Sequence, residues 1–176
     1  MGERRPLIAG NWKMYKTPKE AAETARDLDQ RVASVTDVDI MIAPTYTALA
    51  AVSAVIYKGP VALGAQNLFW ETEGAYTGEI SAPMLKSVGC TYCIIGHSER
   101  RQYFGETDQT VNRRVKAALE FNLIPVVCVG ETLEENEAGQ TSEVFLRQMR
   151  DGLAGVKVAS AGQLVVAYEP VWAIGT

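Results

Sequence analysis

The chain has 176 residues, of which 47% are hydrophobic and 22% charged, with a formal net charge of −4. This length supports one sizeable hydrophobic core and is short for two, so we expect a single domain over residues 1–176. The weak negative charge excludes a general attraction to nucleic acid or to anionic membranes. No apolar run approaches the roughly 20 residues that span a bilayer, and the first is too short for a signal peptide. We therefore expect a cytoplasmic protein with no nucleic-acid or membrane partner.

Six short apolar runs recur along the chain, and a helical pattern follows each of them. The runs predict strands at residues 7–9, 39–44, 61–65, 91–96, 124–130 and 164–168. Helices are expected to begin near Thr17, Thr45, Ser81 and Ser98. The first has Glu20 three residues after the cap at Thr17, which is the spacing of a capping box. A further helix is expected to be capped by Asp108, and a charged helical region is expected from Thr132 to about Ala154. The strands are continuously apolar rather than alternating, which is typical of strands covered on both faces. The pattern predicts an α/β fold with a parallel sheet.

The connection from Gln66 to Ser81 is long for a compact domain, and such loops are usually functional or bind a partner. It carries three aromatic residues, Phe69, Trp70 and Tyr76. Aromatic side chains on a surface loop need cover, which a second subunit could supply.

Three cysteines, Cys90, Cys93 and Cys128, are too few for a disulfide framework and favour a reducing compartment. Cys90 and Cys93 have C-x-x-C spacing, but only Cys128 and His97 remain as further ligands, so a zinc site lacks its second pair. As a redox pair they stand at a strand entry, whereas thiolates are favoured at helix N-termini. We expect packing roles for them and no bound metal. No Gly-rich nucleotide loop of the usual form occurs, so no cofactor is expected either.

The predicted strands end in polar residues: Asn11 and Lys13 follow the first, His97 the fourth, Glu131 the fifth and Glu169 the sixth. The carboxyl ends of parallel strands share one rim, where the site of such folds lies. A carboxylate there can remove a proton beside a carbonyl, while an imidazole and an ammonium stabilise the enolate-like charge. Each residue alone is weak evidence, since a lone lysine is usually solvated and a glutamate after a strand often caps a helix.

Three stretches, Gly10–Met14, Ile95–Arg101 and Tyr168–Thr176, closely resemble the triosephosphate isomerase family. Gln66–Asn67, Gly74–Ile80 and Cys128–Glu131 match the same family in the same order, so the resemblance covers the whole chain. It implies a TIM (β/α)8-barrel, of which this chain carries six of the eight strand–helix units. It also implies a glycolytic and gluconeogenic isomerase that interconverts dihydroxyacetone phosphate and glyceraldehyde 3-phosphate through an enediolate.

The resemblance assigns roles to the residues on the rim. Glu169 would be the base that carries a proton between two substrate carbons, and His97 would polarise the carbonyl as a neutral imidazole. A helix beginning at Ser98 would disfavour the imidazolium, because the helix N-terminus is the positive end of its dipole. Lys13 would offset the charge of the substrate and transition state, and Asn11 would help hold the ligand.

The resemblance also names residues behind the reacting groups. Glu99 would be a supporting carboxylate with Arg114 positioned as its partner, Ser98 would open the helix after His97, and Cys128 would pack near the site.

Pro170, Val171 and Trp172 resemble the first hinge of the family's lid, and Ala173 to Thr176 resemble its tip. Gly175 would donate its backbone N–H to the substrate phosphate, and Ile174 would close over Glu169. A closed lid removes water from the base and retains the reactive intermediate.

The resemblance implies a homodimer, in which the long loop of each subunit reaches the other. Thr77 would approach Asn11 and Lys13 of the partner subunit. Met14 would lie where the partner's loop inserts, and Tyr76 would belong to the same interface.

The sequence departs from the family at its carboxyl end. The family closes eight strands in roughly 250 residues, whereas this sequence carries six strands and stops within the lid. The first and sixth strands are therefore expected to have open edges. We favour a longer polypeptide, or a separate C-terminal fragment that supplies the missing strands, over a shortened protein that survives by self-association.

Two other functional classes compete with the enzyme. The first is a catalytically impaired barrel fragment that acts only as an assembly or interaction module. The second, a serine hydrolase built around Gly96-His97-Ser98, is disfavoured because the second glycine of the G-x-S-x-G motif is missing.

Overall fold

The computed structural model describes residues 5–173, which form one six-stranded sheet. Every strand pairs in parallel with its neighbours in the sequence, so the spatial order equals the chain order. The strands are β1 (Leu7–Asn11), β2 (Asp39–Ala43), β3 (Val61–Ala65), β4 (Tyr92–Ile95), β5 (Ile124–Val129) and β6 (Val165–Tyr168). The predicted α/β fold with a parallel sheet is confirmed.

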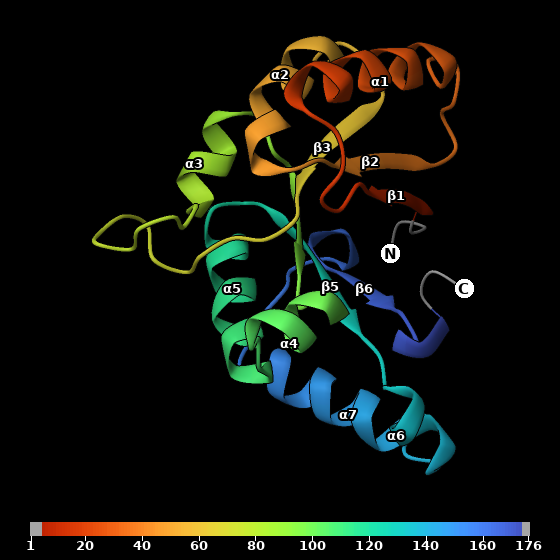
Figure 1. The fold of residues 1–176 in the computed structure, drawn as a ribbon, viewed down its shortest axis with the longest axis vertical. Helices are drawn as coiled ribbons and strands as arrows, with labels where there is room; N and C mark the ends of the chain where they lie inside the picture. The colour runs from red at the N-terminus through yellow and green to blue at the C-terminus, as the bar shows by residue number, and fades with distance from the viewer. Residues whose placement is uncertain (1–4, 174–176) are drawn as a thin grey trace.

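Helices surround the outer face of the curled sheet, as Figure 1 shows. They are α1 (Pro18–Arg31), α2 (Leu49–Ile56), α3 (Ala82–Ser87), α4 (Ser98–Phe104), α5 (Asp108–Glu120), α6 (Leu133–Glu137) and α7 (Thr141–Gly152). Three short 3-10 turns, η1 (Tyr46–Ala48), η2 (Ala161–Gln163) and η3 (Val171–Ala173), complete the regular structure. Within residues 5–173, none of the helices is long and apolar enough to cross a membrane.

Local chemistry sets where these helices begin and end. α1 starts with a capping box between Thr17 and Glu20, as the sequence predicts. The prediction that Asp108 caps α5 is wrong, because the hydroxyl of Thr107 accepts the hydrogen bond from the free backbone N–H of Thr110. The predicted helical region from Thr132 to about Ala154 is confirmed and holds two helices, α6 and α7, which Gly139 separates with a left-handed φ of 73°.

The pleat of the strands divides the apolar residues between two cores. Ile40 and Ile42 of β2 face the helices and belong to the larger core, between sheet and helices. Met41 and Ala43 point the other way, into the concave face of the sheet. The inner core is completed by residues of β4 and β5, namely Tyr92, Ile94, Val126 and Cys128. Side chains therefore fill the inside of the curl, as in a barrel of this type.

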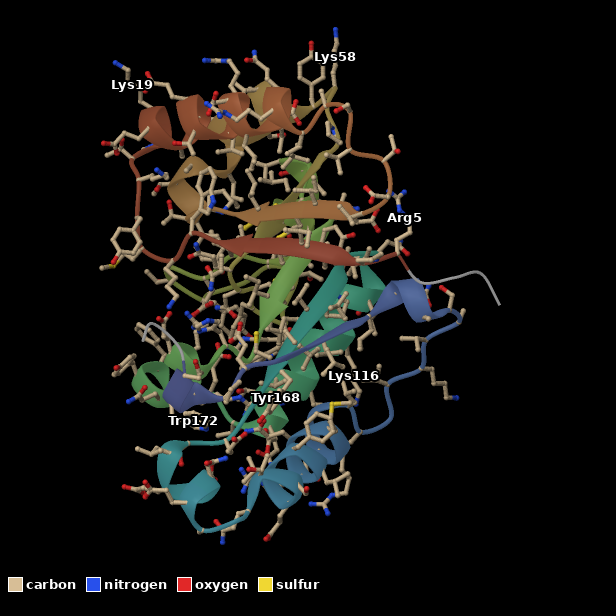
Figure 2. All side chains as sticks on the ribbon, turned by 90° about the vertical axis from the view of Figure 1, so that its right-hand side faces the viewer. Arg5, Lys19, Lys58, Lys116, Tyr168 and Trp172 are labelled. Atoms are coloured by element: carbon tan, nitrogen blue, oxygen red, sulfur yellow. The ribbon has the colours of Figure 1, made fainter. Side chains whose placement is uncertain are left out.

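The two edge strands, β1 and β6, are less covered than the four between them. Ile8 of β1 is 60% exposed, although Ile40, its register partner on β2, is 9% exposed. Both edge strands lie on the right-hand side of Figure 1, and Figure 2 turns that side toward the viewer. In the part of the chain that the structure describes, both strands have a free edge, which agrees with the sequence-based expectation.

Candidate active site

The polar residues predicted at the strand ends meet on one rim of the sheet. Asn11 is the last residue of β1, His97 follows β4 by two residues, and Glu169 directly follows β6. Nε2 of His97 lies 3.6 Å from Oε2 of Glu169. Residues separated by 72 positions in the sequence therefore stand almost within hydrogen-bonding distance.

His97 is fixed by its place at the start of α4. It is the N-cap residue, and its Nδ1 accepts a hydrogen bond of 3.2 Å from the backbone N–H of Glu99. An accepting Nδ1 carries no proton, so the proton of a neutral ring lies on Nε2, the nitrogen that faces Glu169. A carboxylate oxygen of Glu99 also lies 3.5 Å from Nδ1. We read this contact as proximity rather than as an ion pair, because the accepted N–H already occupies the lone pair.

Lys13 reaches the rim from the loop after β1. Its Nζ lies 2.8 Å from a carboxylate oxygen of Glu99. The hydrogen bond to Glu99 raises the pKa of Lys13, partial burial opposes this, and the negative charges of Glu99 and Glu169 raise it further. Lys13 therefore keeps its positive charge at neutral pH.

The backbone of Lys13 is held in an uncommon conformation, with a φ of 51°. Two neighbours support it. Oδ1 of Asn11 accepts a hydrogen bond of 3.0 Å from the backbone N–H of Lys13. The side-chain amide of Gln66 donates bonds of 2.8 Å to the carbonyls of Lys13 and Ala43. The sequence pattern alone assigns no role to Gln66. Its position directly after β3 is nevertheless the kind of position that the other polar residues of the rim occupy.

Glu169 is held mainly by its backbone. Its N–H donates a 2.8 Å bond to the carbonyl of Val129, which continues the pairing of β5 and β6. Gly130 packs so closely against it that a Cβ at position 130 would stand 1.8 Å from the Glu169 carbonyl oxygen. Only glycine fits there, and the close approach lets the backbone of Glu169 lie directly against the end of β5.

Glu131, also at the rim, serves the hinge after β6 rather than the group around His97. Its side chain is 1% exposed and accepts hydrogen bonds from the Trp172 indole, the Tyr168 hydroxyl and the Asn136 amide. Its carbonyl accepts a fourth bond from the N–H of Val171. Burial alone would raise the pKa of Glu131, but the hydrogen bonds, led by that from Trp172, lower it overall. Glu131 therefore holds the start of the segment that resembles a lid.

The prediction that Arg114 pairs with Glu99 is wrong. Arg114 is buried and lies 3.6 Å from Glu106, and its Nε donates a 2.9 Å bond to the carbonyl of Leu68. Burial lowers the pKa of Arg114, while the charge of Glu106 opposes that change. The reason is positional: Arg114 lies in α5 on the helix side of the sheet, whereas Glu99 turns toward Lys13 on the rim.

The other predicted residues occupy the following places. Ser98 is the first residue of α4 and half-buried, and Cys128 is buried in the inner core, which raises the pKa of its thiol. Pro170 to Ala173 continue from β6 into the turn η3. The predicted lid residues Ile174, Gly175 and Thr176 lie outside the described residues.

The C-x-x-C cysteines are both buried in the outer core. Burial raises the pKa of Cys90 to about 12, and it raises the pKa of Cys93 well above its usual value. Thiols in such surroundings are poor thiolates, so the position suits packing.

The predicted interface residues are on the surface. Met14 is 92% exposed, and Tyr76 and Thr77 lie on the exposed tip of the loop from Gln66 to Ser81. The loop aromatics partly cover one another, since the ring centroid of Phe69 lies 4.2 Å from that of Trp70 and 4.7 Å from that of Tyr76. Whether a second subunit covers them stays a prediction.

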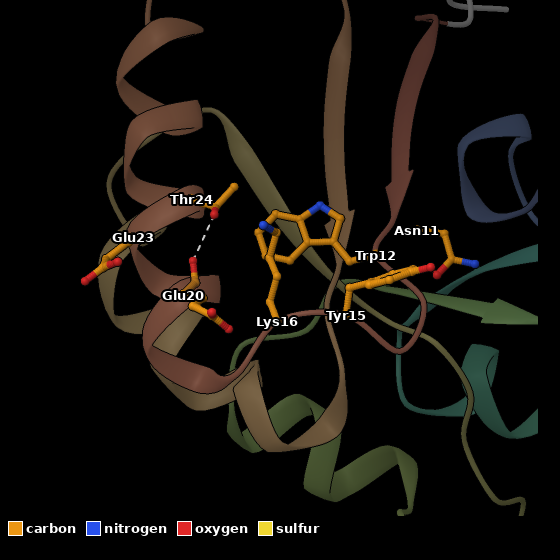
Figure 3. Close-up of a pocket in the computed structure, with 7 residues that line it drawn as sticks. All are labelled: Asn11, Trp12, Tyr15, Lys16, Glu20, Glu23 and Thr24. Carbon is orange, nitrogen blue, oxygen red and sulfur yellow. Dashed lines mark hydrogen bonds between the residues drawn. The ribbon is translucent and has the colours of Figure 1, made fainter.

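A separate open cleft of about 630 Å³ lies between the end of β1 and the start of α1 (Figure 3). Its walls are Asn11, Trp12, Tyr15, Lys16, Glu20, Glu23 and Thr24. Nζ of Lys16 stands 5.7 Å from the centre of the Trp12 ring, and Glu20 is already bonded to Thr17 in the α1 cap. The cleft includes neither His97 nor Glu169, so the chemistry of the rim lies elsewhere.

Comparisons with known proteins show the family to which the chain belongs. The sequence model of triosephosphate isomerase matches residues 6–176. Triosephosphate isomerase of Moorella thermoacetica is 56% identical over 173 residues, which are 98% of this chain and 69% of the relative. That of Geobacter metallireducens is 54% identical with the same coverage.

The crystal structure of triosephosphate isomerase from Bartonella henselae superposes with a TM-score of 0.90 at 38% identity. The match covers 96% of this chain and 69% of that structure. The six strand–helix units are therefore those of a TIM barrel, and the chain belongs to the triosephosphate isomerase family.

Proposed function

We propose that this chain provides the proton-transfer site of an isomerase that interconverts dihydroxyacetone phosphate and glyceraldehyde 3-phosphate. The observation that carries the proposal is the 3.6 Å approach of His97 Nε2 and Glu169 Oε2, with the ammonium of Lys13 bound to Glu99 beside them. These are a base, a hydrogen-bond donor and a cation on one rim. Their types match what proton abstraction beside a carbonyl requires.

In the proposed reaction, Glu169 removes a proton from the substrate carbon next to the carbonyl. The Nε2–H of His97 donates a hydrogen bond to the carbonyl oxygen, on which negative charge develops. The proton then returns from Glu169 to the neighbouring carbon, while the hydroxyl proton passes to the former carbonyl oxygen. The hydroxyl carbon thereby becomes the new carbonyl, which completes the isomerisation. Lys13 stabilises the charge of the phosphate and of the enediolate, and Asn11 contributes to the ligand contacts through the backbone of Lys13 that it holds.

The segment after Glu169 is proposed to close over the bound substrate. Glu131 anchors its first residues through Val171 and Trp172. Beyond them, Gly175 is proposed to bind the phosphate through its N–H, and Ile174 to cover Glu169. Removing water from the carboxylate makes it a stronger base.

The protein is further proposed to act in the cytoplasm as a homodimer, with Met14, Tyr76 and Thr77 in the interface. The exposure of Met14 and of the loop tip supports this arrangement. A complementary fragment with two more strand–helix units is proposed to bind between β1 and β6. The free edge that each of these strands has among the described residues supports this proposal.

The proposal is tested by an isomerase assay on purified protein of known intact mass. We expect Glu169→Asp, which withdraws the carboxylate by one methylene, and His97→Gln each to lower kcat by roughly 10²–10⁴-fold. Arg26→Gln, on the exposed surface of α1, serves as the control and should leave kcat unchanged. A brisk wild-type rate that survives Glu169→Asp would exclude Glu169 as the base. An intact, closed barrel without turnover would exclude the enzyme.

The second candidate function is a non-enzymatic assembly module, which the exposed edge strands favour. It predicts a stable complex with a second chain and no isomerase activity in that complex. The same assay, run on the complex, decides between the two functions.

A further inference from the structure

A small cavity lies between Glu169 and α4. Its volume of about 10 Å³ is close to that needed by the centre of a single water molecule. Its walls include Gly96, Ser98 and Arg101 on one side and Cys128, Gly130 and Glu169 on the other. The cavity therefore touches the proposed base and an arginine that has no role in the proposed reaction.

Two residues that line this cavity each carry a buried polar atom with no hydrogen-bond partner among residues 5–173. The atoms are Nη2 of Arg101 and Oε2 of Glu169. The first can only donate a hydrogen bond and the second, when ionised, can only accept one. Oε2 is also 3.6 Å from Nε2 of His97, which is too long for a hydrogen bond. A water molecule between Nη2 and Oε2 would satisfy both.

Two glycines line the cavity. Gly96 has a φ of +74°, and a Cβ there would stand 3.2 Å from Nη2 of Arg101 and 3.5 Å from the carbonyl oxygen of Cys128. Nη2 therefore lies against the open face of Gly96, which lines the cavity. Gly130 lines the opposite side, against the backbone of Glu169.

The other nitrogens fix the direction of the guanidinium. Nε of Arg101 donates a 2.9 Å bond to the carbonyl of Gly96, and Nη1 donates a 2.6 Å bond to Asp108. Asp108 is in turn 3.6 Å from Arg147 on the solvent side. A guanidinium is planar, so two fixed nitrogens also fix the third. The free Nη2–H bonds thus have one defined direction.

We propose that Arg101 is a positioning residue for the base: its Nη2 holds one water molecule in this cavity, and that water donates a hydrogen bond to Oε2 of Glu169. The carboxylate is then held through Oε2, and Oε1 stays free for the substrate. This inference rests on the proposed function, because it assigns Arg101 a part in the same reaction.

Arg101 also contributes charge. Groups near Glu169 include His97 at 3.6 Å, Lys13, whose positive charge couples to it, and the neighbouring thiol of Cys128. Arg101 lines the same cavity as Glu169 and adds a second positive charge beside it. Removing a positive charge beside a carboxylate generally disfavours the ionised form.

The first test is a crystal structure of the wild-type protein at a resolution that shows ordered water. We expect one water peak within hydrogen-bond distance of both Nη2 of Arg101 and Oε2 of Glu169, and its loss in Arg101→Met. A direct bond between the two side chains, or a cavity without density, would overturn the proposal. This test needs no turnover, so its outcome is separate from that of the proposed function.

The second test compares kinetics across three variants. In Arg101→Met we expect kcat to fall about tenfold with KM within twofold, since Arg101 does not touch substrate. The acidic limb of the kcat/KM profile should move to higher pH. Asp108→Asn keeps the guanidinium and removes a negative charge, so its acidic limb should move to lower pH or stay. If the Arg101–Asp108 ion pair had only a structural role, the acidic limb would move in the same direction in Arg101→Met and Asp108→Asn. That result would refute the proposal.

Arg147→Gln is the matched control, because it perturbs the same Asp108 from the solvent side. It should leave the water peak and the pH profile unchanged. Arg101→Lys keeps the charge but has no Nη2, so it should restore the pH profile without restoring the water. Full recovery of kcat in Arg101→Lys would show that charge alone suffices and would exclude the water.

Discussion

The central strands and the edge strands of the sheet support the candidate site unequally. His97 follows β4, which has a neighbour on each side and residues buried on both faces. Lys13 and Glu169 follow β1 and β6, which pair on one side only among the described residues. The side chain of His97 is 7% exposed, whereas those of Lys13 and Glu169 are 34% and 36% exposed.

This difference separates the components of the proposed reaction. His97, the proposed hydrogen-bond donor, follows a central strand. Glu169, the proposed base, and Lys13, the cation, follow the two edge strands. Local stability follows buried apolar contacts, so the margins should open more readily than the centre. Anything that closes the edges should therefore change Lys13 and Glu169 first and His97 last.

The largest effect on stability is expected from Ile95→Ala in β4. Ile95 is fully buried in the outer core, so the change leaves a cavity and should lower the free energy of unfolding by about 2–5 kcal/mol. Urea denaturation monitored by circular dichroism measures it. A loss below about 1 kcal/mol would contradict the view that β4 is the rigid centre.

A smaller effect is expected from Glu131→Gln, which replaces the charged acceptor at the hinge. It should cost about 1–3 kcal/mol at pH 7, because the donors of Tyr168 and Trp172 lose an ionised partner. The folded-state pKa of Glu131 is lowered. The stability contributed by Glu131 is therefore complete above the pKa of the unfolded carboxyl, and it is lost as the pH falls through the lower folded value.

Urea titrations at a series of pH values from 7 to 3 check this dependence. The difference between wild type and Glu131→Gln should shrink toward acid pH. A difference that stays constant over the whole series would show that the ionisation of Glu131 does not stabilise the hinge.

The smallest effect is expected from Ile8→Ala in β1. Ile8 is the same residue type on the same side of the sheet as Ile95, but it is 60% exposed. The substitution should cost less than about 1 kcal/mol, because little apolar area leaves water on folding. A loss comparable to that of Ile95→Ala would show that another chain covers β1 in solution.

The arrangement of the strands could be predicted from the sequence, because each strand is a short apolar run and the sheet follows the chain order. All six runs became strands, and the helix that opens at Thr17 has the predicted capping box. The break at Gly139 and the cap at Thr107 were missed. Both depend on local backbone geometry that a helical pattern does not contain.

The meeting of Lys13, His97 and Glu169 on one rim could also be predicted, since parallel strands end together. Individual side-chain partners could not. Arg114 lies near the negative charges of Glu106 and Glu79, and it pairs with Glu106 rather than with Glu99. The parts of Gln66 and Glu131 depend on contacts across 53 and 41 positions of sequence, which spacing does not reveal.

The sequential order of the strands has a consequence for synthesis. During translation each new strand finds its only required neighbour already made, so the sheet can grow one unit at a time. The edge that is open at each stage is the template for the next strand. Ribosome-bound chains should thus gain Lys13 first, then His97, and last Glu169. The three residues of the proposed site are together only when β6 is added.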